Sequence, residues 1–251
     1  MAKINVVTGR GGTGKSTFTC LFSRYINIKP LLLIDLDPDG SLPKMFGLDL
    51  EKEGKFTISD ALYEVMGKGR DTKDVPDLLK QKMEEGSIIY RGKKFDLITL
   101  GTKLAPGCYC LPDEMIKEMI KNLEKRYEMV VVDSPAGLEH LNRKVTPDID
   151  DLFVILDPSE KSIKHIERIK YVTKGVRINY KNFYLVGNYR FNDEAESYLI
   201  NSGERYLGRI LYDENVRKSN LEGKSLLEIP EDSPSSLSIK RIIEEAGYDI
   251  I

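Results

Sequence analysis

The chain has 251 residues, 41% of them hydrophobic, which is long and apolar enough to bury a substantial core. Its 38 basic and 40 acidic side chains leave a formal net charge of -2, so nothing suggests a nucleic-acid partner. No stretch approaches 18 apolar residues, and no signal peptide precedes the first predicted strand. We therefore expect a single domain over residues 1–251, placed in the cytoplasm and without membrane contact.

Short apolar runs alternate with helical patterns along the chain. Strands are predicted at 4–8, 31–35, 129–133, 152–156, 183–186 and 206–211. Residues 87–90 and 95–100 are expected to pair as a hairpin. Helices are predicted at 16–26, 57–66, 75–83, 111–127, 161–173, 194–201, 214–222 and 235–246. This alternation predicts the α/β class, with a single doubly wound, mostly parallel sheet flanked by helices on both faces.

The loop between the first strand and the first helix reads Gly9-Arg10-Gly11-Gly12-Thr13-Gly14-Lys15-Ser16, which fits the phosphate-binding pattern G-x-x-x-x-G-K-[ST]. Glycines let the backbone turn its N–H groups toward a phosphate at the helix N-terminus. Lys15 is expected to reach the β- and γ-phosphates, and Ser16 to offer its hydroxyl to Mg²⁺. The same glycines spell the dinucleotide pattern G-x-G-x-x-G, with Asp35 ending the next strand. That pattern does not require Lys-Ser, so we favour the phosphate loop.

Two further predicted strands end in aspartates, in the segments Asp35-Leu36-Asp37-Pro38-Asp39 and Asp133-Ser134-Pro135-Ala136-Gly137. Ligands of open α/β sheets bind beyond the carboxyl ends of the strands, which makes these loops candidates for the same site. Mg²⁺ with its waters would satisfy a buried Asp133, although capping a loop or helix is the simpler alternative. Asp37 is predicted to position the water that attacks a γ-phosphate, and Asp35 is an alternative ligand for the metal.

These motifs, with Thr17 completing the loop, resemble the deviant Walker ATPases, the class of MinD, ParA and the nitrogenase iron protein. The resemblance implies ATP or ADP with Mg²⁺, and an ATP-driven homodimer with a sandwiched nucleotide. In that class a signature lysine reaches the partner's nucleotide. Arg10 takes this position here, and its charge suits a cross-dimer role.

The resemblance extends to the strand ends that border the base. It implies that Asn188 reads adenine, with an ordinary turn residue as the alternative. It also places Asp213 in a segment that flanks the base. This chain has Leu211 where the class often has a proline before that aspartate.

The three cysteines are Cys20, Cys108 and Cys110, an odd number that argues against a disulfide framework. Cys20 falls in the first predicted helix and is expected in the core. Cys108 and Cys110 are one residue apart and can chelate a metal. In a twofold dimer the two pairs would give four thiolates, which suit tetrahedral Zn²⁺ or planar Ni²⁺. From the spacing alone, two incidental loop thiols are equally acceptable.

The segments Leu100–Thr102, Gly107–Pro112 and Ala136–Leu141 resemble the CooC family, the nickel-insertion accessory ATPases of carbon monoxide dehydrogenase. The resemblance implies an ATP-dependent dimer that carries nickel on Cys108 and Cys110 to the apo-enzyme. Arg10 and the Ser134-Pro135 pair depart from that family, and Ser134-Pro135 is closer to MinD. His140 is either a relay between nucleotide and metal or an ordinary structural histidine.

Two other functions share the ATPase motifs. A MinD- or ParA-like positioning or partition ATPase is the main alternative, although a basic excess and a basic amphipathic tail are both missing. A reductase similar to the nitrogenase iron protein would need cluster cysteines, and Ala136–Leu141 contains none.

Overall fold

A computed structural model describes residues 2–67, 81–82, 85–102, 117–118, 120–123, 125–137 and 148–251. Of the helices expected at 75–83 and 111–127, the described residues 81–82, 117–118 and 120–123 are helical. The other residues of those two segments lie largely outside the described part, as do Cys108, Cys110 and His140.

The described strands form one eight-stranded sheet in the order β3-β4-β2-β5-β1-β6-β7-β8. All neighbouring strands run parallel except β3 and β4, which form the expected hairpin. The bounds are β1 Lys3–Gly9, β2 Leu31–Asp35, β3 Tyr90–Arg91, β4 Asp96–Thr99, β5 Met129–Asp133, β6 Asp148–Leu156, β7 Asn179–Gly187 and β8 Arg205–Arg209. The central strands β2 and β5 are buried at every position, as strands covered on both faces must be.

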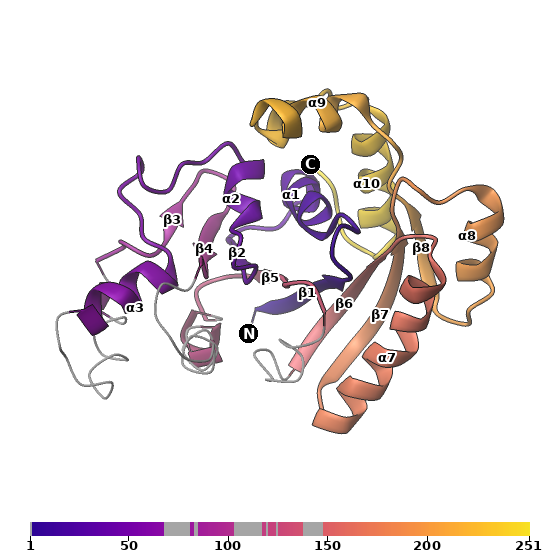
Figure 1. The fold of residues 1–251 in the computed structure, drawn as a ribbon, viewed down its shortest axis with the longest axis horizontal. Coiled ribbons are helices and arrows are strands. Elements are labelled where there is room, and N and C mark those ends of the chain that lie inside the picture. The colour runs from indigo at the N-terminus through magenta and orange to yellow at the C-terminus, as the bar shows by residue number, and fades with distance from the viewer. Residues whose placement is uncertain are drawn as a thin grey trace.

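Helices cover both faces of the sheet (Figure 1). On one face the core joins the sheet to α3, α7 and α8, and on the other to α1, α2 and α10. The bounds are α1 Lys15–Tyr25, α2 Ser41–Met45, α3 Ile58–Gly67, α7 Glu160–Val176, α8 Asp193–Ile200, α9 Glu214–Glu222, the 3-10 helix η2 Leu226–Glu228 and α10 Pro234–Glu245. The predicted doubly wound, mostly parallel α/β fold is thereby confirmed.

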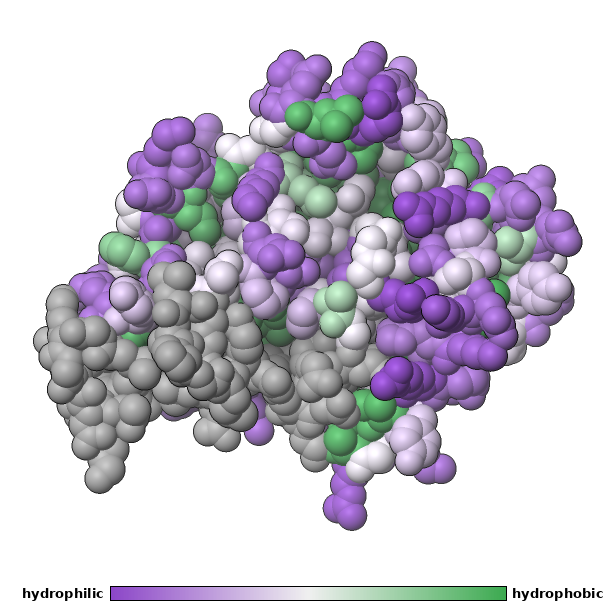
Figure 2. All heavy atoms as spheres, viewed as in Figure 1, coloured by the Kyte–Doolittle hydropathy of each residue, from purple (hydrophilic) through white to green (hydrophobic). Residues whose placement is uncertain are grey.

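The surface seen in Figure 2 is mostly hydrophilic, with a small hydrophobic area over α9. Helix α9 contributes no buried residue, and its Leu221 is exposed. Within the described part of the chain, no helix has the length and apolar character needed to span a membrane.

Strands β6 and β7 begin several residues earlier than predicted. Their first halves are polar and lack the apolar run used to predict strands. The polar side chains satisfy one another across the two strands: Asn179 donates to Asp148 at 3.0 Å, Asn182 donates to Asp151 at 2.6 Å, and Lys181 pairs with Asp150. Cross-strand pairing therefore extends a sheet that hydrophobicity alone would end.

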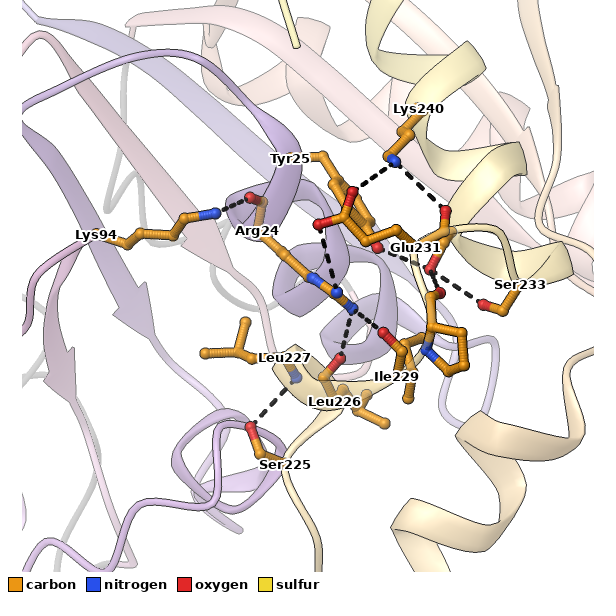
Figure 3. Close-up of polar contacts among 12 residues, drawn as sticks. Arg24, Tyr25, Lys94, Ser225, Leu226, Leu227, Ile229, Glu231, Ser233 and Lys240 are labelled. Carbon is orange, nitrogen blue, oxygen red and sulfur yellow. Dashed lines mark hydrogen bonds and ion pairs between the residues drawn. The ribbon is translucent and has the colours of Figure 1, made fainter. Parts of the chain in front are cut away.

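Arg24 fastens the carboxyl end of α1 to the C-terminal part of the chain (Figure 3). Its guanidinium donates to the carbonyl oxygens of Ile229 at 2.8 Å and Leu226 at 3.3 Å. Arg24 is only 8% exposed, so these buried carbonyls depend on it for a donor. On the other side, Lys94 donates to the carbonyl oxygen of Arg24 from the turn before β4. The helix that begins at the phosphate loop is thus fixed at its far end.

We expect Arg24→Ala to lower the free energy of unfolding by about 2 kcal/mol, because the carbonyls of Leu226 and Ile229 would stay buried without a donor. Glu231→Gln is the matched control. The Glu231 side chain lies 3.8 Å from Arg24 but is 70% exposed, so its loss should lower stability by less than about 1 kcal/mol. Urea unfolding measures both variants, and equal losses would contradict the importance of the carbonyl contacts.

Candidate active site

The glycine-rich loop connects β1 to α1 at the carboxyl edge of the sheet. Gly12 and Gly14 have φ angles of 75° and 98°, which side-chain-bearing residues rarely adopt. Gly14 is the N-cap of α1 and brings no side chain to cap the helix. The first N–H groups of α1 are therefore free of a capping side chain, and together with the helix dipole they favour an anion.

Lys15 lies folded back over this loop. Its Nζ donates to the carbonyl oxygen of Arg10 at 3.3 Å, and the Thr13 hydroxyl donates to the same oxygen at 2.9 Å. Burial lowers the pKa of Lys15, while the negative charges of Asp133 and Asp37 act in the opposite direction. Lys15 thus lies near the carboxylates of Asp133 and Asp37.

Asp133, at the end of β5, is fully buried and has one oxygen in use. Its Oδ1 accepts from the Thr19 hydroxyl at 3.3 Å, and the nearby Ser16 hydroxyl acts to lower the pKa of the carboxyl. Its Oδ2 has no hydrogen-bond partner among the described residues. Burial raises the pKa of Asp133, against the bonds from Ser16 and Thr19 and the charge of Lys15. A buried oxygen without a partner is costly, and these hard oxygen donors fit Mg²⁺.

Asp35 lies beside Asp133 in the register of β2 and β5 but has a different environment. Its Oδ1 accepts the N–H of Asp37 and its Oδ2 accepts the N–H of Leu42, both at 3.0 Å. Burial, and then the charge of Asp133, raise the pKa of Asp35. Because both oxygens hold the backbone that leads into α2, the geometry favours Asp133 over Asp35 as the metal ligand.

Asp37 lies half-buried in the turn that Asp35 organises. Its Oδ1 accepts the N–H of Asp39 at 3.1 Å, and the N–H of Gly40 donates to its carbonyl oxygen at 3.0 Å. The carboxylate is near enough to raise the pKa of Lys15 by its charge. Asp37 therefore lies near Lys15 of the glycine-rich loop.

The two remaining loop side chains point to neighbouring helices. Arg10 Nη1 donates to the Ser159 hydroxyl at 3.3 Å, at the start of α7. The Thr17 hydroxyl lies 4.0 Å from the sulfur of Met45 in α2. Arg10 therefore contacts the start of α7, and Thr17 joins α1 to the segment that follows Asp37.

Asn188 lies directly after β7, and only the oxygen of its side-chain amide is hydrogen-bonded to described residues. Its Oδ1 accepts the N–H of Arg190 at 3.0 Å, whereas no described residue accepts from its Nδ2. The residue is 2% exposed, and a buried donor without a partner is costly. The rings of Tyr189 and Tyr212 lie next in sequence to Asn188 and Asp213, 5.8 Å apart and about half exposed.

Asp213 serves the scaffold with both of its oxygens. Oδ1 accepts the N–H of Asn215 at 2.8 Å and so caps α9. Oδ2 accepts from the N–H and hydroxyl of Ser235, at 3.2 and 2.6 Å, at the start of α10. Asp213 therefore joins the start of α9 to the start of α10, directly after Tyr212.

Sequence reasoning did not single out Thr19, Ser159 or the two tyrosines. Thr19 lies one helical turn after Ser16, so helical periodicity gave a signal for its position beside Asp133. Ser159 precedes a predicted helix, as an N-cap does. Tyr189 and Tyr212 adjoin residues that were predicted to border a base.

Cys20 is buried in α1, and its thiol points to the carbonyl oxygen of Met45 at 3.8 Å. Burial raises the pKa of this thiol far above its ordinary value. Its predicted core position is confirmed. In the described ranges, no group of three or more His, Cys, Asp and Glu side chains is arranged to hold a metal ion.

Three comparisons relate the chain to known proteins. Residues 1–184 match the AAA_31 family, an AAA domain. An uncharacterized ATP-binding protein of Methanocaldococcus jannaschii is 31% identical, over 96% of this chain and 97% of that protein. The carbon monoxide dehydrogenase accessory protein CooC of Rhodospirillum rubrum is 23% identical, over 89% of each chain. The MinD cell division protein of Aquifex aeolicus has a similar structure, with a TM-score of 0.69, 20% identity and coverage of 98% of this chain and 97% of that one.

The glycines of the loop make separable predictions. A Cβ on Gly9 would lie 2.4 Å from the Ile155 carbonyl oxygen, whereas a Cβ on Gly11 would meet only Ala136, at 3.5 Å. We expect Gly9→Ala to lower the free energy of unfolding by about 2 kcal/mol or more. Gly11→Ala should change it by less than about 0.5 kcal/mol. Urea unfolding without nucleotide compares the two, and equal stabilities would contradict the close approach of β1 and β6.

Proposed function

This chain belongs to the AAA_31 family, and from that premise we propose that it is an ATP-driven homodimer that carries nickel or zinc on Cys108 and Cys110. The chain is a P-loop ATPase: family, phosphate loop and similarity to an ATP-binding relative agree. The observation that carries the site is the buried, unpartnered Oδ2 of Asp133 beside Ser16 and Lys15.

In the proposed reaction, Lys15 and the N-terminus of α1 bind the β- and γ-phosphates of ATP. Ser16 and Asp133 would hold Mg²⁺, which neutralises charge on those phosphates. Asp37 orients the attacking water and accepts its proton. Asp35 fixes the turn that carries Asp37, through the bonds to the N–H groups of Asp37 and Leu42.

The base would lie at the ends of β7 and β8. The free Nδ2 donor of Asn188 suits a ring nitrogen acceptor of adenine. Tyr189 and Tyr212 offer exposed ring faces beside it, against which a base can stack. Asp213 supports this region through its bonds to α9 and α10.

Arg10 is proposed to reach the nucleotide of the partner subunit and to act there as the signature lysine acts in the deviant Walker class. A guanidinium binds phosphate oxygens in a bidentate manner, so arginine can replace lysine at this position. ATP, bound between two copies of the chain, would then close the dimer.

The metal-carrying role is supported by the spacing of Cys108 and Cys110 and by the similarity to CooC. Closing of the dimer would bring two cysteine pairs together around one ion, and ATP hydrolysis would separate them. The proposed client is apo carbon monoxide dehydrogenase, and the proposed location is the cytoplasm.

A positioning or partition ATPase is the second candidate. Its support is the fold shared with MinD, together with Ser134-Pro135 after β5, which is closer to MinD than to CooC. Cosedimentation with liposomes or DNA that requires ATP and is lost in ADP would favour this candidate over metal delivery.

We expect Lys15→Ala and Asp37→Ala to fail at different steps. Lys15→Ala should weaken nucleotide binding by about 100-fold, because it removes the charge beside the phosphates. Asp37→Ala should bind ATP normally and hydrolyse it about 100-fold more slowly. Fluorescent-nucleotide titration and phosphate release separate the two effects. Rapid ATP hydrolysis by Asp37→Ala would contradict this role and would mean that another residue positions the attacking water.

The cysteine pair predicts a metal stoichiometry. Wild-type protein should bind one nickel or zinc ion per dimer, and the double variant Cys108→Ser, Cys110→Ser should bind none. Cys20→Ala is the matched control and should bind as the wild type does, because the Cys20 thiol is buried and protonated. Metal analysis after gel filtration measures the bound metal in all three proteins. Equal amounts of metal per dimer in the wild type and the double variant would contradict a metal site at Cys108 and Cys110.

A further inference from the structure

The contact between Arg10 and Ser159 joins the phosphate loop to α7. Ser159 is itself fixed by two further bonds: its hydroxyl accepts the N–H of Ser162 at 3.2 Å, and its N–H donates to Asp157 Oδ1 at 2.9 Å. The N–H of Asp157 in turn donates to the Ser162 hydroxyl at 3.1 Å. Ser159 is thus a fixed acceptor for Arg10 at the start of a helix.

The surroundings of Arg10 disfavour a strong hold. The N-terminus of α7 carries the positive end of the helix dipole, which opposes a cation. Burial lowers the pKa of His165, and the positive charges of the half-exposed Arg10, of Arg168 and of Lys15 lower it further. At 3.3 Å, a bond to a neutral hydroxyl is also long for a guanidinium. Arg10 therefore rests among other positive groups on a weak acceptor.

We propose that Ser159 is a positioning residue that holds Arg10 on its own subunit and thereby restrains ATP hydrolysis until the partner subunit is in place. The inference rests on the proposed function, in which Arg10 acts on the partner's nucleotide. One guanidinium group cannot remain on Ser159 and also reach across the dimer. The strength of this contact then sets how readily Arg10 leaves it.

The test replaces Ser159 by two residues of equal shape. Asp and Asn are both good N-caps, so α7 keeps its start in either variant, but only Asp places a negative charge against Arg10. We expect kcat for ATP to be about tenfold lower in Ser159→Asp than in Ser159→Asn. KM should differ by less than about twofold, because the nucleotide site of the same subunit is intact. Equal kcat values would overturn the proposal.

Repeating the pair in an Arg10→Ala background separates a specific contact from a general effect of charge. Without Arg10, the Asp and Asn variants should hydrolyse ATP at the same rate. A difference that persists would mean that the new carboxylate repels the phosphates directly, and would overturn the holding role.

Arg10→Ala with Ser159 unchanged distinguishes the cross-dimer role of Arg10 from the holding role of Ser159. Slow hydrolysis by this variant supports the cross-dimer role; equal rates for the Asp and Asn variants would then overturn only the inference about Ser159. Full activity of Arg10→Ala would overturn both.

Discussion

Two buried carboxylates at the ends of neighbouring parallel strands are the constraint around which the site is organised. Asp35 and Asp133 are paired in the register of β2 and β5, and burial, followed by the charge of Asp133, raises the pKa of Asp35. The fold compensates them differently. Two backbone N–H groups satisfy Asp35, whereas one oxygen of Asp133 has no hydrogen-bond partner in the part of the chain that the structure describes. We propose that a cation bound beside Asp133 compensates this buried charge together with Lys15.

Helix α1 connects the aspartates at the edge of the sheet to the C-terminal part of the chain. Its first residue is Lys15, its second turn provides Thr19 for Asp133, and its last turn places Arg24 against the carbonyls of the C-terminal segment. The C-terminal segment leads into α10, whose start is bonded to Asp213 beside the proposed base site. The phosphate loop and Asp213 are thus connected through α1 and the buried Arg24, whose contacts are drawn in Figure 3.

The central strands and the phosphate loop could be predicted because their signals are local. Apolar runs identify β2 and β5, and the loop motif fixes Lys15 and Ser16 by sequence alone. The use of each aspartate could not be predicted in the same way. Asp35 and Asp213 occupy expected positions, but their oxygens are taken by N–H groups and hydroxyls that only the folded chain brings near. The polar first halves of β6 and β7 were missed for a similar reason, because their partners lie about 30 residues apart in sequence.

The most direct measurement is the effect of Mg²⁺ on ADP affinity, by calorimetry in Mg²⁺ and in EDTA, for wild type and Asp133→Asn. Asparagine keeps the size of the side chain and an acceptor for Thr19 but removes the negative charge. We expect Mg²⁺ to tighten ADP binding by about tenfold or more in the wild type, and much less in Asp133→Asn. The same response to Mg²⁺ in both proteins, or none in the wild type, would contradict a metal role for the unpartnered oxygen of Asp133.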